Sequence, residues 1–234
     1  MILLDQFMSQ DVIALVTDRT ADFSLKDHGA KELPPAQKEV LSRYIGGFLE
    51  NLVYIKQVHG LNVIEITKKF LGQYSLMEAD GLITREANVP LTIRTADCLP
   101  IFLFDPVQRA IGLVHAGWKG TLQRIVSRTI LQMQEKWGTA PADLKVALGP
   151  AIRSCCYEVG EEFKKYFPDE IFCKEDRLHF DLPLANRRQL LQASVRENRI
   201  FDCGLCTCCN PRFFSYRKEG ESAGRMLSLM MIKG

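Results

Sequence analysis

The chain has 234 residues, of which 47% are hydrophobic and 25% are charged, and its formal net charge is +2. This composition predicts a folded globular protein with a sizeable core. The near-neutral charge and the lack of a long basic run argue against binding to nucleic acid or to a membrane surface. The first residues, MILLDQFMSQDVIALVTDR, contain neither a signal peptide nor a transmembrane pattern. We therefore expect a cytoplasmic protein, and by default a monomer.

The first half of the chain is predicted to be rich in strands. Residues 12–17 (VIALVT) form the first expected strand, and residues 20–35 form a polar, turn-rich loop. Residues 36–50 carry apolar side chains at helical spacing. Short strands are then expected within LVYIKQVHG, NVIEIT, ADGLITR, PLTIRTAD, PIFLFD and AIGLVHAG. The DPVQ segment predicts a turn between the last two of them.

The second half is predicted to contain more helix. Residues 121–137 have a buried helical face, and residues 143–152 read as a strand that leads into a turn. A short helix is expected over residues 157–167, and a longer one within residues 179–195. The tail, residues 213–234, is expected to form two strands around an exposed loop.

Several predicted strands follow one another without a helix between them, which argues against a doubly wound parallel sheet. The pattern favours an α+β fold with mixed β-sheets. We find no internal repeat and no linker, so a single domain over residues 1–234 is expected.

Three side chains occupy similar places at the ends of predicted strands. His59 lies in QVHG, Cys98 in TADCLP and His115 in HAGWKG, and each is followed within two residues by Gly or Pro. Strand ends at one edge of a sheet converge, so these residues could meet. Two imidazoles and one thiolate suit Zn²⁺ and leave its fourth position open, as in catalytic zinc sites.

Spacing alone leaves other interpretations open for these three residues. Their separations match no short metal-binding motif, and a histidine at a strand end is often structural. Cys98 could instead be a nucleophile with His59 or His115 as its base. Copper is a further possibility, because nitrogen and sulfur ligands also bind Cu(II).

The AGWKG turn after His115 suggests an anion site. It leads from a strand into a helix expected to start near Thr121, and Lys119 lies within it. Free N–H groups at a helix N-terminus attract phosphate. The alternative is an ordinary strand-to-helix turn with Trp118 packed over it.

The chain has eight cysteines, an unusual number for a protein without an export signal. CGLCTCCN (203–210) contains four of them, and these could form a zinc or iron–sulfur site. Structural zinc sites normally take ligand pairs from two separated segments, so a second metal is the less favoured interpretation there. Cys155 and Cys156 are expected to pack as small apolar residues.

Six motifs occur together in a fixed order: QVHG, ADGLIT, RTADCLPI, HAGWKG, LGPAI–CCYEVG and FFSYR–GR. From about residue 53 onward the chain thereby resembles the YfiH family, also called the laccase-domain, polyphenol oxidase or peptidoglycan editing factor family. The resemblance implies mixed sheets sandwiched between helical layers. It also implies zinc bound by His59, Cys98 and His115.

The resemblance further implies phosphorolysis of purine nucleosides (adenosine, inosine and methylthioadenosine) and deamination of adenosine. Copper-dependent oxidation of phenols and editing of peptidoglycan precursors have also been assigned to the family. The sequence departs from the family in TDRTADFSLKDHG (17–29). This stretch lacks the usual Gly pair, has Lys26 where Asn is usual, and offers Arg19 in a shifted position.

Each activity would need further groups. For deamination, Asp97 and Glu158 are candidate proton donors and acceptors around a zinc-activated water. For phosphorolysis, Arg43, Lys119 and Arg217 are candidates for holding phosphate. The expected partners are therefore a purine nucleoside and phosphate.

Three further functions stay open at this point. Cys98 could serve as the nucleophile of a cysteine hydrolase or of a peptidoglycan-precursor editing factor. The zinc could be non-catalytic in a protein that binds a partner. A copper-dependent polyphenol oxidase is less favoured, because multicopper oxidases need more histidines than the four in this chain.

Overall fold

The computed structural model describes residues 1–24, 33–71 and 74–234 of the chain. Its largest sheet has six strands in the order β14-β10-β8-β9-β6-β4. The pairs β10·β8, β8·β9 and β6·β9 are antiparallel, whereas both edge strands pair in parallel. The strands are β4 (Val63–Glu65), β6 (Gly81–Thr84), β8 (Leu99–Asp105), β9 (Ala110–Ala116), β10 (Lys145–Leu148) and β14 (Ile200–Asp202).

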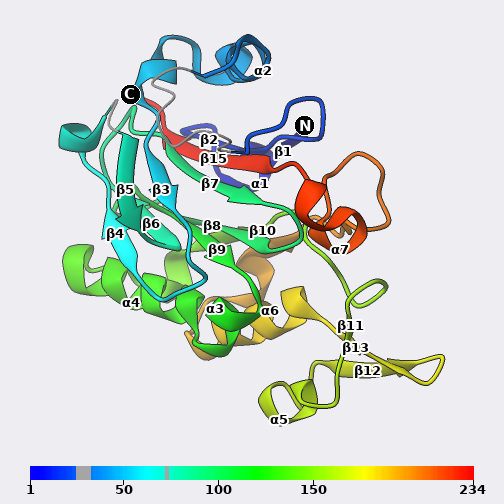
Figure 1. Ribbon diagram of the computed structural model, residues 1–234. Coiled ribbons are helices and arrows are strands. Elements are labelled where there is room, and N and C mark those ends of the chain that lie inside the picture. The colour runs from blue at the N-terminus through cyan, green and yellow to red at the C-terminus, as the bar shows by residue number, and fades with distance from the viewer. Residues whose placement is uncertain (25–32, 72–73) are drawn as a thin grey trace.

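A second sheet has four antiparallel strands in the order β1-β2-β15-β7. The strands are β1 (Ile2–Leu3), β2 (Val12–Val16), β7 (Leu91–Thr95) and β15 (Met226–Ile232). This sheet joins segments from both ends of the chain, since β15 lies between β2 and β7. The red β15 crosses above the green strands of the larger sheet in Figure 1.

A hydrophobic core fills the space between the two sheets. Phe102 and Phe104 of β8 pack there against side chains of β7 and β15, such as Leu91 and Met230. Ile101 and the other alternate side chains of β8 point to the opposite face, into a second core. All seven residues of β8 are buried, as expected for a strand covered on both sides.

Helices cover the outer faces of both sheets. α4 (Ile125–Trp137) and α6 (Leu182–Gln192) pack on the six-stranded sheet, and α2 (Pro35–Ile45) covers the four-stranded one. Figure 1 shows this order of layers, with α2 at the top and α4 with α6 at the bottom. The prediction of an α+β fold with mixed sheets between helical layers is therefore confirmed.

The helix expected over residues 121–137 is two helices. α3 (Trp118–Leu122) ends before Arg124, which has a left-handed backbone with φ of 65°. This residue acts as the N-cap of α4. The chain therefore turns sharply just after the HAGWKG motif.

Two other predicted segments differ from the structure. Residues 157–167 form β11 (Glu158–Val159) and α5 (Phe163–Tyr166) instead of one helix. The tail has one strand, β15, because residues 216–219 form the helix α7 (Tyr216–Glu219). The Ser215 side chain caps this helix by accepting a hydrogen bond from the Lys218 N–H.

Smaller elements complete the fold. β11 joins a three-stranded sheet that extends to the lower right in Figure 1, and β3 pairs with β5. None of the helices in the described part of the chain is long and apolar enough to cross a membrane. The remaining elements are α1 (Asp5–Met8), β3 (Tyr54–Lys56), β5 (Tyr74–Glu78), β12 (Ile171–Lys174), β13 (Arg177–Phe180) and the 3₁₀ turns at Gly46–Asn51, Lys68–Phe70, Pro141–Asp143, Glu197–Arg199 and Gly220–Ser222.

Candidate metal centre and cleft

Three potential metal ligands meet at one end of the central β-hairpin. Cys98 directly precedes β8, and His115 lies near the end of β9, where Pro100 pairs with His115. His59 comes from the loop after β3, and its Nε2 lies 3.8 Å from the Cys98 Sγ. One ligand atom from each residue lies within 4.8 Å of the other two. The structure thus brings together all three residues that the strand-end pattern predicted.

The carboxylate of Asp80 holds two of these ligands in place. Asp80 is fully buried between β5 and β6, and its Oδ1 lies 2.7 Å from His115 Nδ1. The same carboxylate accepts hydrogen bonds from the N–H groups of Val58, His59 and Gly60. Because His115 Nδ1 is engaged, its Nε2 is left as the ligand atom, an arrangement found in many carboxylate–histidine–metal sites.

The groups of the site shift one another's pKa values: that of Cys98 is lowered and that of His115 is raised. Burial alone would raise the pKa of the Cys98 thiol, but the charge and hydrogen bond of His115, with help from His59, lower it to about 6. Burial would lower the pKa of His115, but Cys98 and Asp80 raise it to about 9. Hydrogen bonds from His115 and Gly60 outweigh burial and hold the pKa of Asp80 below its usual value. Without a metal, these shifts make Cys98 a thiolate and His115 an imidazolium near neutral pH.

Gly117 makes room for the ligands. A Cβ atom at this position would lie 2.9 Å from the Cys98 Sγ and 3.0 Å from the His59 Cδ2. Real Cβ atoms do not approach other atoms so closely, and both neighbours are held by the site. The glycine of HAGWKG is thus needed so that the chain after His115 can pass beside the other two ligands.

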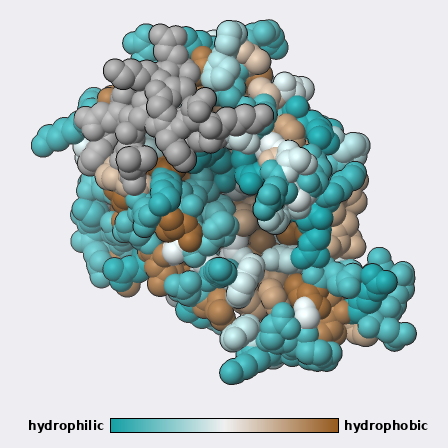
Figure 2. Space-filling model, viewed as in Figure 1, coloured by the Kyte–Doolittle hydropathy of each residue, from teal (hydrophilic) through white to brown (hydrophobic). Residues whose placement is uncertain are grey.

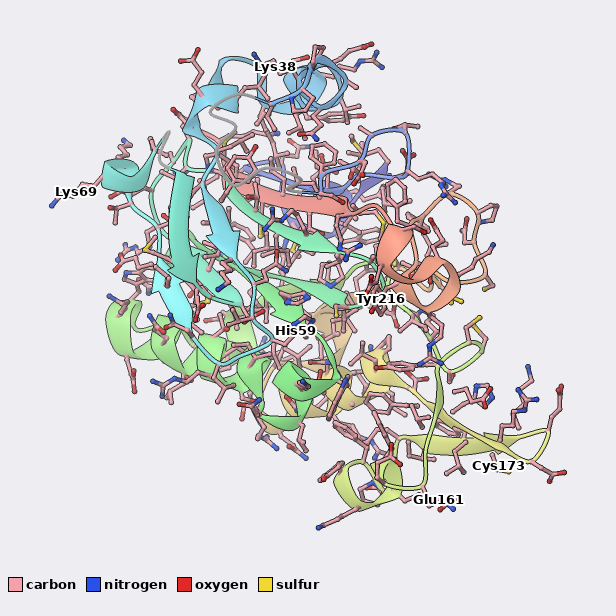
Figure 3. All side chains as sticks on the ribbon, in the orientation of Figure 1. Lys38, His59, Lys69, Glu161, Cys173 and Tyr216 are labelled. Atoms are coloured by element: carbon pink, nitrogen blue, oxygen red, sulfur yellow. The ribbon has the colours of Figure 1, made fainter. Side chains whose placement is uncertain are left out.

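The three ligands lie on the wall of a cleft with a volume of about 1180 Å³. In Figure 3, His59 lies in the middle of the molecule, and Tyr216 of α7 lies near it across the cleft. Figure 2 shows the same face hollowed near its centre, with hydrophilic side chains around the rim. The cleft is lined by cationic side chains of Lys56, Arg94, Lys119, Arg217 and Arg225 and by aromatic rings of Trp118, Tyr157 and Tyr216.

Two of the predicted phosphate-binding residues line this cleft, and one does not. Lys119 lies in α3 with its Nζ 5.7 Å from the Trp118 ring centre. Arg217 lies over the Tyr157 ring and donates a hydrogen bond to the Glu158 carbonyl oxygen. Neither cation forms an ion pair with another described residue. Arg43 is instead an exposed residue of α2, paired with Glu39 of the same helix.

The two predicted proton-transfer residues have different surroundings. Glu158 lies outside the cleft lining, with its half-exposed carboxylate paired with Arg177 at 3.0 Å. Asp97 is buried beside Cys98, but its oxygens accept hydrogen bonds from Thr207 Oγ1, Ser215 Oγ and the Arg217 N–H. Asp97 thus connects the loops around the cleft.

Sequence reasoning overlooked several residues of the site. Asp80 is part of the ADGLIT motif, and an acidic residue directly before a buried strand was the available signal. Arg94 alternates with apolar residues in β7, so its position could be read as solvent-facing, yet it donates to the Ile55 carbonyl oxygen inside the cleft wall. Lys26, part of the divergent N-terminal stretch, lies outside the described residues.

The donor set fits a metal ion. Soft thiolate and borderline imidazole donors on three sides, with an open cleft on the fourth, match the donor types of catalytic zinc centres. His115 also has the buried carboxylate partner that such ligands usually have.

Comparisons with known proteins identify relatives of this chain. The profile of a family described as "Multi-copper polyphenol oxidoreductase laccase" matches residues 24–233. A protein of Clostridium acetobutylicum named purine nucleoside phosphorylase is 33% identical over 79% of this chain and 78% of its own length. Purine nucleoside phosphorylase YlmD of Geobacillus stearothermophilus is 35% identical over 81% of this chain and 75% of its own.

Solved structures share the fold. YfiH of Bacillus licheniformis superposes with a TM-score of 0.84 at 27% identity, over 95% of this chain and 93% of that one. YlmD of Geobacillus stearothermophilus gives a TM-score of 0.83 at 29% identity, over 96% and 93%. The chain therefore belongs to the YfiH-like laccase-domain family that its motifs resemble.

Proposed function

We propose that the protein is a metal-dependent purine nucleoside phosphorylase whose active site is the cleft beside His59, Cys98 and His115. The observation that carries the proposal is the meeting of these three ligand atoms within 4.8 Å, at a cleft lined by cationic and aromatic side chains. The names of the relatives, which are 33% and 35% identical over most of both chains, support the same reaction class.

In this proposal, His59, Cys98 and His115 hold a zinc ion. A zinc ion there would act as a Lewis acid towards an oxygen or nitrogen of the substrate or a bound water. Asp80 fixes the ring of His115 through Nδ1 and the loop of His59 through backbone N–H groups. These bonds keep the ligand atoms in position before a substrate arrives.

Phosphate would bind on the cationic side of the cleft. Lys119 and Arg217 are our candidates, because both line the cleft and neither forms an ion pair with another described residue. Arg94 and Arg225 share these two properties. Arg217 is fixed by its bond to the Glu158 carbonyl and by the Tyr157 ring beneath it. A planar, pre-positioned guanidinium is well suited to two phosphate oxygens.

The purine would lie against the aromatic wall. Trp118, Tyr157 and Tyr216 line the cleft, and the Trp118 ring is supported from behind by Phe163, with ring centres 5.3 Å apart. Flat rings offer large contact area to a flat base. In this proposal the wall binds the purine ring that adenosine, inosine and methylthioadenosine share.

The reaction then follows from these positions. A phosphate oxygen forms a bond to C1′ of the ribose while the bond from C1′ to the purine nitrogen breaks. The electron pair of that bond leaves with the purine, which takes up a proton, and the product is ribose 1-phosphate. Positive charge develops on the sugar during this step, so an anionic phosphate held close by stabilises it.

Adenosine deamination is a second activity of the same site in this proposal. It would release inosine and ammonia without any need for phosphate, by attack of a metal-activated water on C6 of the purine. Asp97, which lines the cleft beside Cys98, is a carboxylate that could move a proton in this step, although its oxygens already accept three hydrogen bonds.

The alternatives predict different properties. A cysteine hydrolase with Cys98 as nucleophile is compatible with the thiolate–imidazolium pair, but it requires an accessible thiolate in the protein as isolated. A multicopper oxidase is disfavoured by the donor set, because the chain has only four histidines and His179 lies in β13, outside the cleft lining. Metal content and thiol reactivity separate these cases.

The first test combines metal analysis with a nucleoside assay. The protein is purified without added metal, its zinc and copper are quantified, and adenosine is supplied with and without phosphate. We expect adenine to appear only with phosphate, and inosine to appear in both conditions if deamination also occurs. Cys98→Ala should lose both activities. Bound zinc without turnover of adenosine, inosine or methylthioadenosine would rule out the proposed function but would still support the metal site.

A matched pair of variants tests the phosphate site. Arg217→Ala should raise the KM for phosphate by about tenfold or more, because a charge-assisted hydrogen bond is worth about 1.5–3 kcal/mol. Arg43→Ala should leave it unchanged, since Arg43 lies on α2 outside the cleft lining. Equal effects of the two changes would contradict the placement of phosphate beside Arg217.

A further inference from the structure

Four cysteines outside the cleft converge into a second cluster, which we call the thiol cluster. It consists of Cys155, Cys156, Cys206 and Cys209, and their sulfur atoms all lie within 4.8 Å of one another. The sulfurs of Cys155 and Cys209 are 3.9 Å apart, although these residues are 54 positions apart in sequence. All eight cysteines of the chain are free thiols.

The cluster is built from two separate turns. Cys155 and Cys156 lie in a turn in which the N–H groups of Cys156 and Tyr157 donate to the Arg153 carbonyl oxygen. Cys206 and Cys209 form a Cys-x-x-Cys turn closed by a bond from the Asn210 N–H to the Cys206 carbonyl oxygen. Structural zinc sites draw ligand pairs from separated segments, and Cys206 and Cys209 have the spacing typical of such a pair, whereas Cys155 and Cys156 are adjacent. Of the four cysteines in the run at residues 203–210, only Cys206 and Cys209 belong to the cluster.

A direct backbone link aligns the two turns. Ala151 and Cys206 form a parallel β-bridge, and the Thr207 N–H donates to the Ala151 carbonyl oxygen at 3.0 Å. The main chain therefore fixes the positions of the two turns relative to each other. Such fixed positions favour a site that is organised before its ligand binds.

The thiol cluster lies at the edge of the fold. Cys206 is buried, Cys156 is half-buried, and Cys155 and Cys209 are exposed. Four thiolates side by side would repel one another, and a divalent cation among them would offset part of that repulsion.

The spacing of the sulfurs fits a tetrahedral metal site. In a tetrahedral site with bonds of about 2.3 Å to zinc, neighbouring sulfurs are about 3.8 Å apart. The 3.9 Å between Cys155 and Cys209 matches this separation and is far longer than the roughly 2.05 Å of a disulfide. The sulfurs are also close enough for a single ion, and four soft sulfur donors select zinc over Mg²⁺ or Ca²⁺.

We propose that Cys155, Cys156, Cys206 and Cys209 bind a structural zinc ion that joins the 151–157 turn to the 203–210 turn. Four protein ligands leave no open position, so this zinc does not itself bind substrate. It supports the cleft from behind: Thr207, within the Cys-x-x-Cys turn, donates to the Asp97 carboxylate at 2.6 Å, and Ile152 and Tyr157 line the cleft. This inference does not depend on the proposed nucleoside activity.

The test begins with the Cys98→Ala variant, which removes a ligand of the cleft metal and keeps the thiol cluster. Purified with a thiol reductant and loaded with ZnCl₂, it should hold about one zinc per chain, with X-ray absorption showing only sulfur neighbours at about 2.3 Å. A Cys98→Ala protein without zinc, or one whose zinc has nitrogen neighbours, would overturn the inference. So would loss of two hydrogens by mass, the mark of a disulfide, in the reduced preparation.

Two double variants give matched comparisons. Cys98→Ala with Cys209→Ala should lose this zinc, because Cys209 is a ligand with an exposed side chain whose removal disturbs little packing. Cys98→Ala with Cys173→Ala should keep it, since Cys173 lies at the far end of the β12 hairpin (Figure 3) and outside the cluster. Equal zinc in both double variants would overturn the inference.

A melting experiment covers the case in which the Cys209 variant folds poorly. A chelator should lower the Tm of Cys98→Ala by several degrees, because a ligand that binds only the folded state stabilises it. A Tm unchanged by a chelator that has removed the zinc would show that the ion does not support the fold. Phosphorolysis of adenosine that persists in Cys209→Ala, with Cys98 intact, would support the nucleoside proposal independently of the thiol cluster.

Discussion

Two buried aspartates flank the candidate metal centre, and they act on different parts of it. Asp80 contacts a ligand directly, through the Nδ1 of His115, and also holds the loop that carries His59. Asp97 is adjacent to Cys98 in sequence, yet its carboxylate contacts Thr207, Ser215 and the Arg217 backbone. Proximity in sequence is therefore a poor guide to which carboxylate serves the metal.

The difference extends to the charge of the site. Asp80 helps to raise the pKa of His115, and His115 in turn is the main group that lowers the pKa of Cys98. Asp97 is not among the main causes of either shift. Substitutions at the two aspartates should thus separate metal binding and thiolate formation from the stability of the surrounding loops.

The largest effect is expected for Asp80→Asn on metal affinity. The neutral amide keeps the size of the side chain but weakens the bond to His115, and loss of such a partner typically costs about 10–100-fold in metal affinity. Competition with a chromogenic chelator measures this change. Asp97→Asn should bind the metal as tightly as the unmodified protein. A similar loss of metal affinity in both variants would show that the two aspartates do not differ in their roles.

A smaller effect is expected for Asp97→Asn on stability. Two donors, Ser215 Oγ and the Arg217 N–H, converge on Oδ2, which the amide group would replace or force to reorient. We expect the free energy of unfolding to fall by about 2 kcal/mol, measured by urea denaturation. If Asp97 instead transfers a proton, the variant would keep its stability and lose one limb of its pH–rate profile.

The reactivity of Cys98 should follow Asp80 and not Asp97. In chelator-treated protein, alkylation of Cys98 should fall as the pH drops through about 6, because the thiolate is the reactive form and its pKa is about 6. Asp80→Asn makes the imidazolium of His115 less stable, so the thiol pKa should rise and alkylation at pH 7 should slow by up to about tenfold. Asp97→Asn should leave the midpoint unchanged.

Protection by metal adds a control to this measurement. In zinc-loaded protein the sulfur of Cys98 would be occupied, and alkylation should be slow at every pH tested. Rapid, irreversible alkylation of Cys98 in protein that retains its metal would instead favour the cysteine hydrolase.

The smallest effect is expected for Thr207→Val. The substitution keeps the shape of a fully buried side chain and removes a single hydrogen bond to Asp97, so stability should fall by about 1 kcal/mol. Thermal unfolding can detect this change. A loss as large as that of Asp97→Asn would mean that the Thr207 bond alone carries the connection between the loops.

The sequence was most informative where a residue's role follows from its own strand. Cys98 and His115 flank or end strong apolar runs, so their positions at one end of a sheet could be predicted. The α+β layers could also be predicted, because strands and helices carry distinct periodicities. Asp80 was overlooked, since its role depends on loops and strands that approach only in the folded chain.

Other features depended on contacts between distant segments. Arg43 has a charge that suits phosphate, but its helix, α2, packs on the four-stranded sheet. There Arg43 forms an ion pair with Glu39 of the same helix. The thiol cluster requires the bridge between Ala151 and Cys206. Nothing in the local spacing of the CGLCTCCN run indicates that Cys206 and Cys209 face Cys155.

The pairing of β8 with β9 also limits where the chain can change length. Cys98 and His115 lie at the same end of the hairpin, because Leu99, next to Cys98, pairs with Ala116, next to His115, and the turn at 106–109 closes the other end. A residue inserted within β8 would invert its remaining side chains between the two cores and separate the ligands. A residue inserted in the turn would do neither. Among descendants of this chain, insertions should therefore accumulate in that turn and be absent from the two strands.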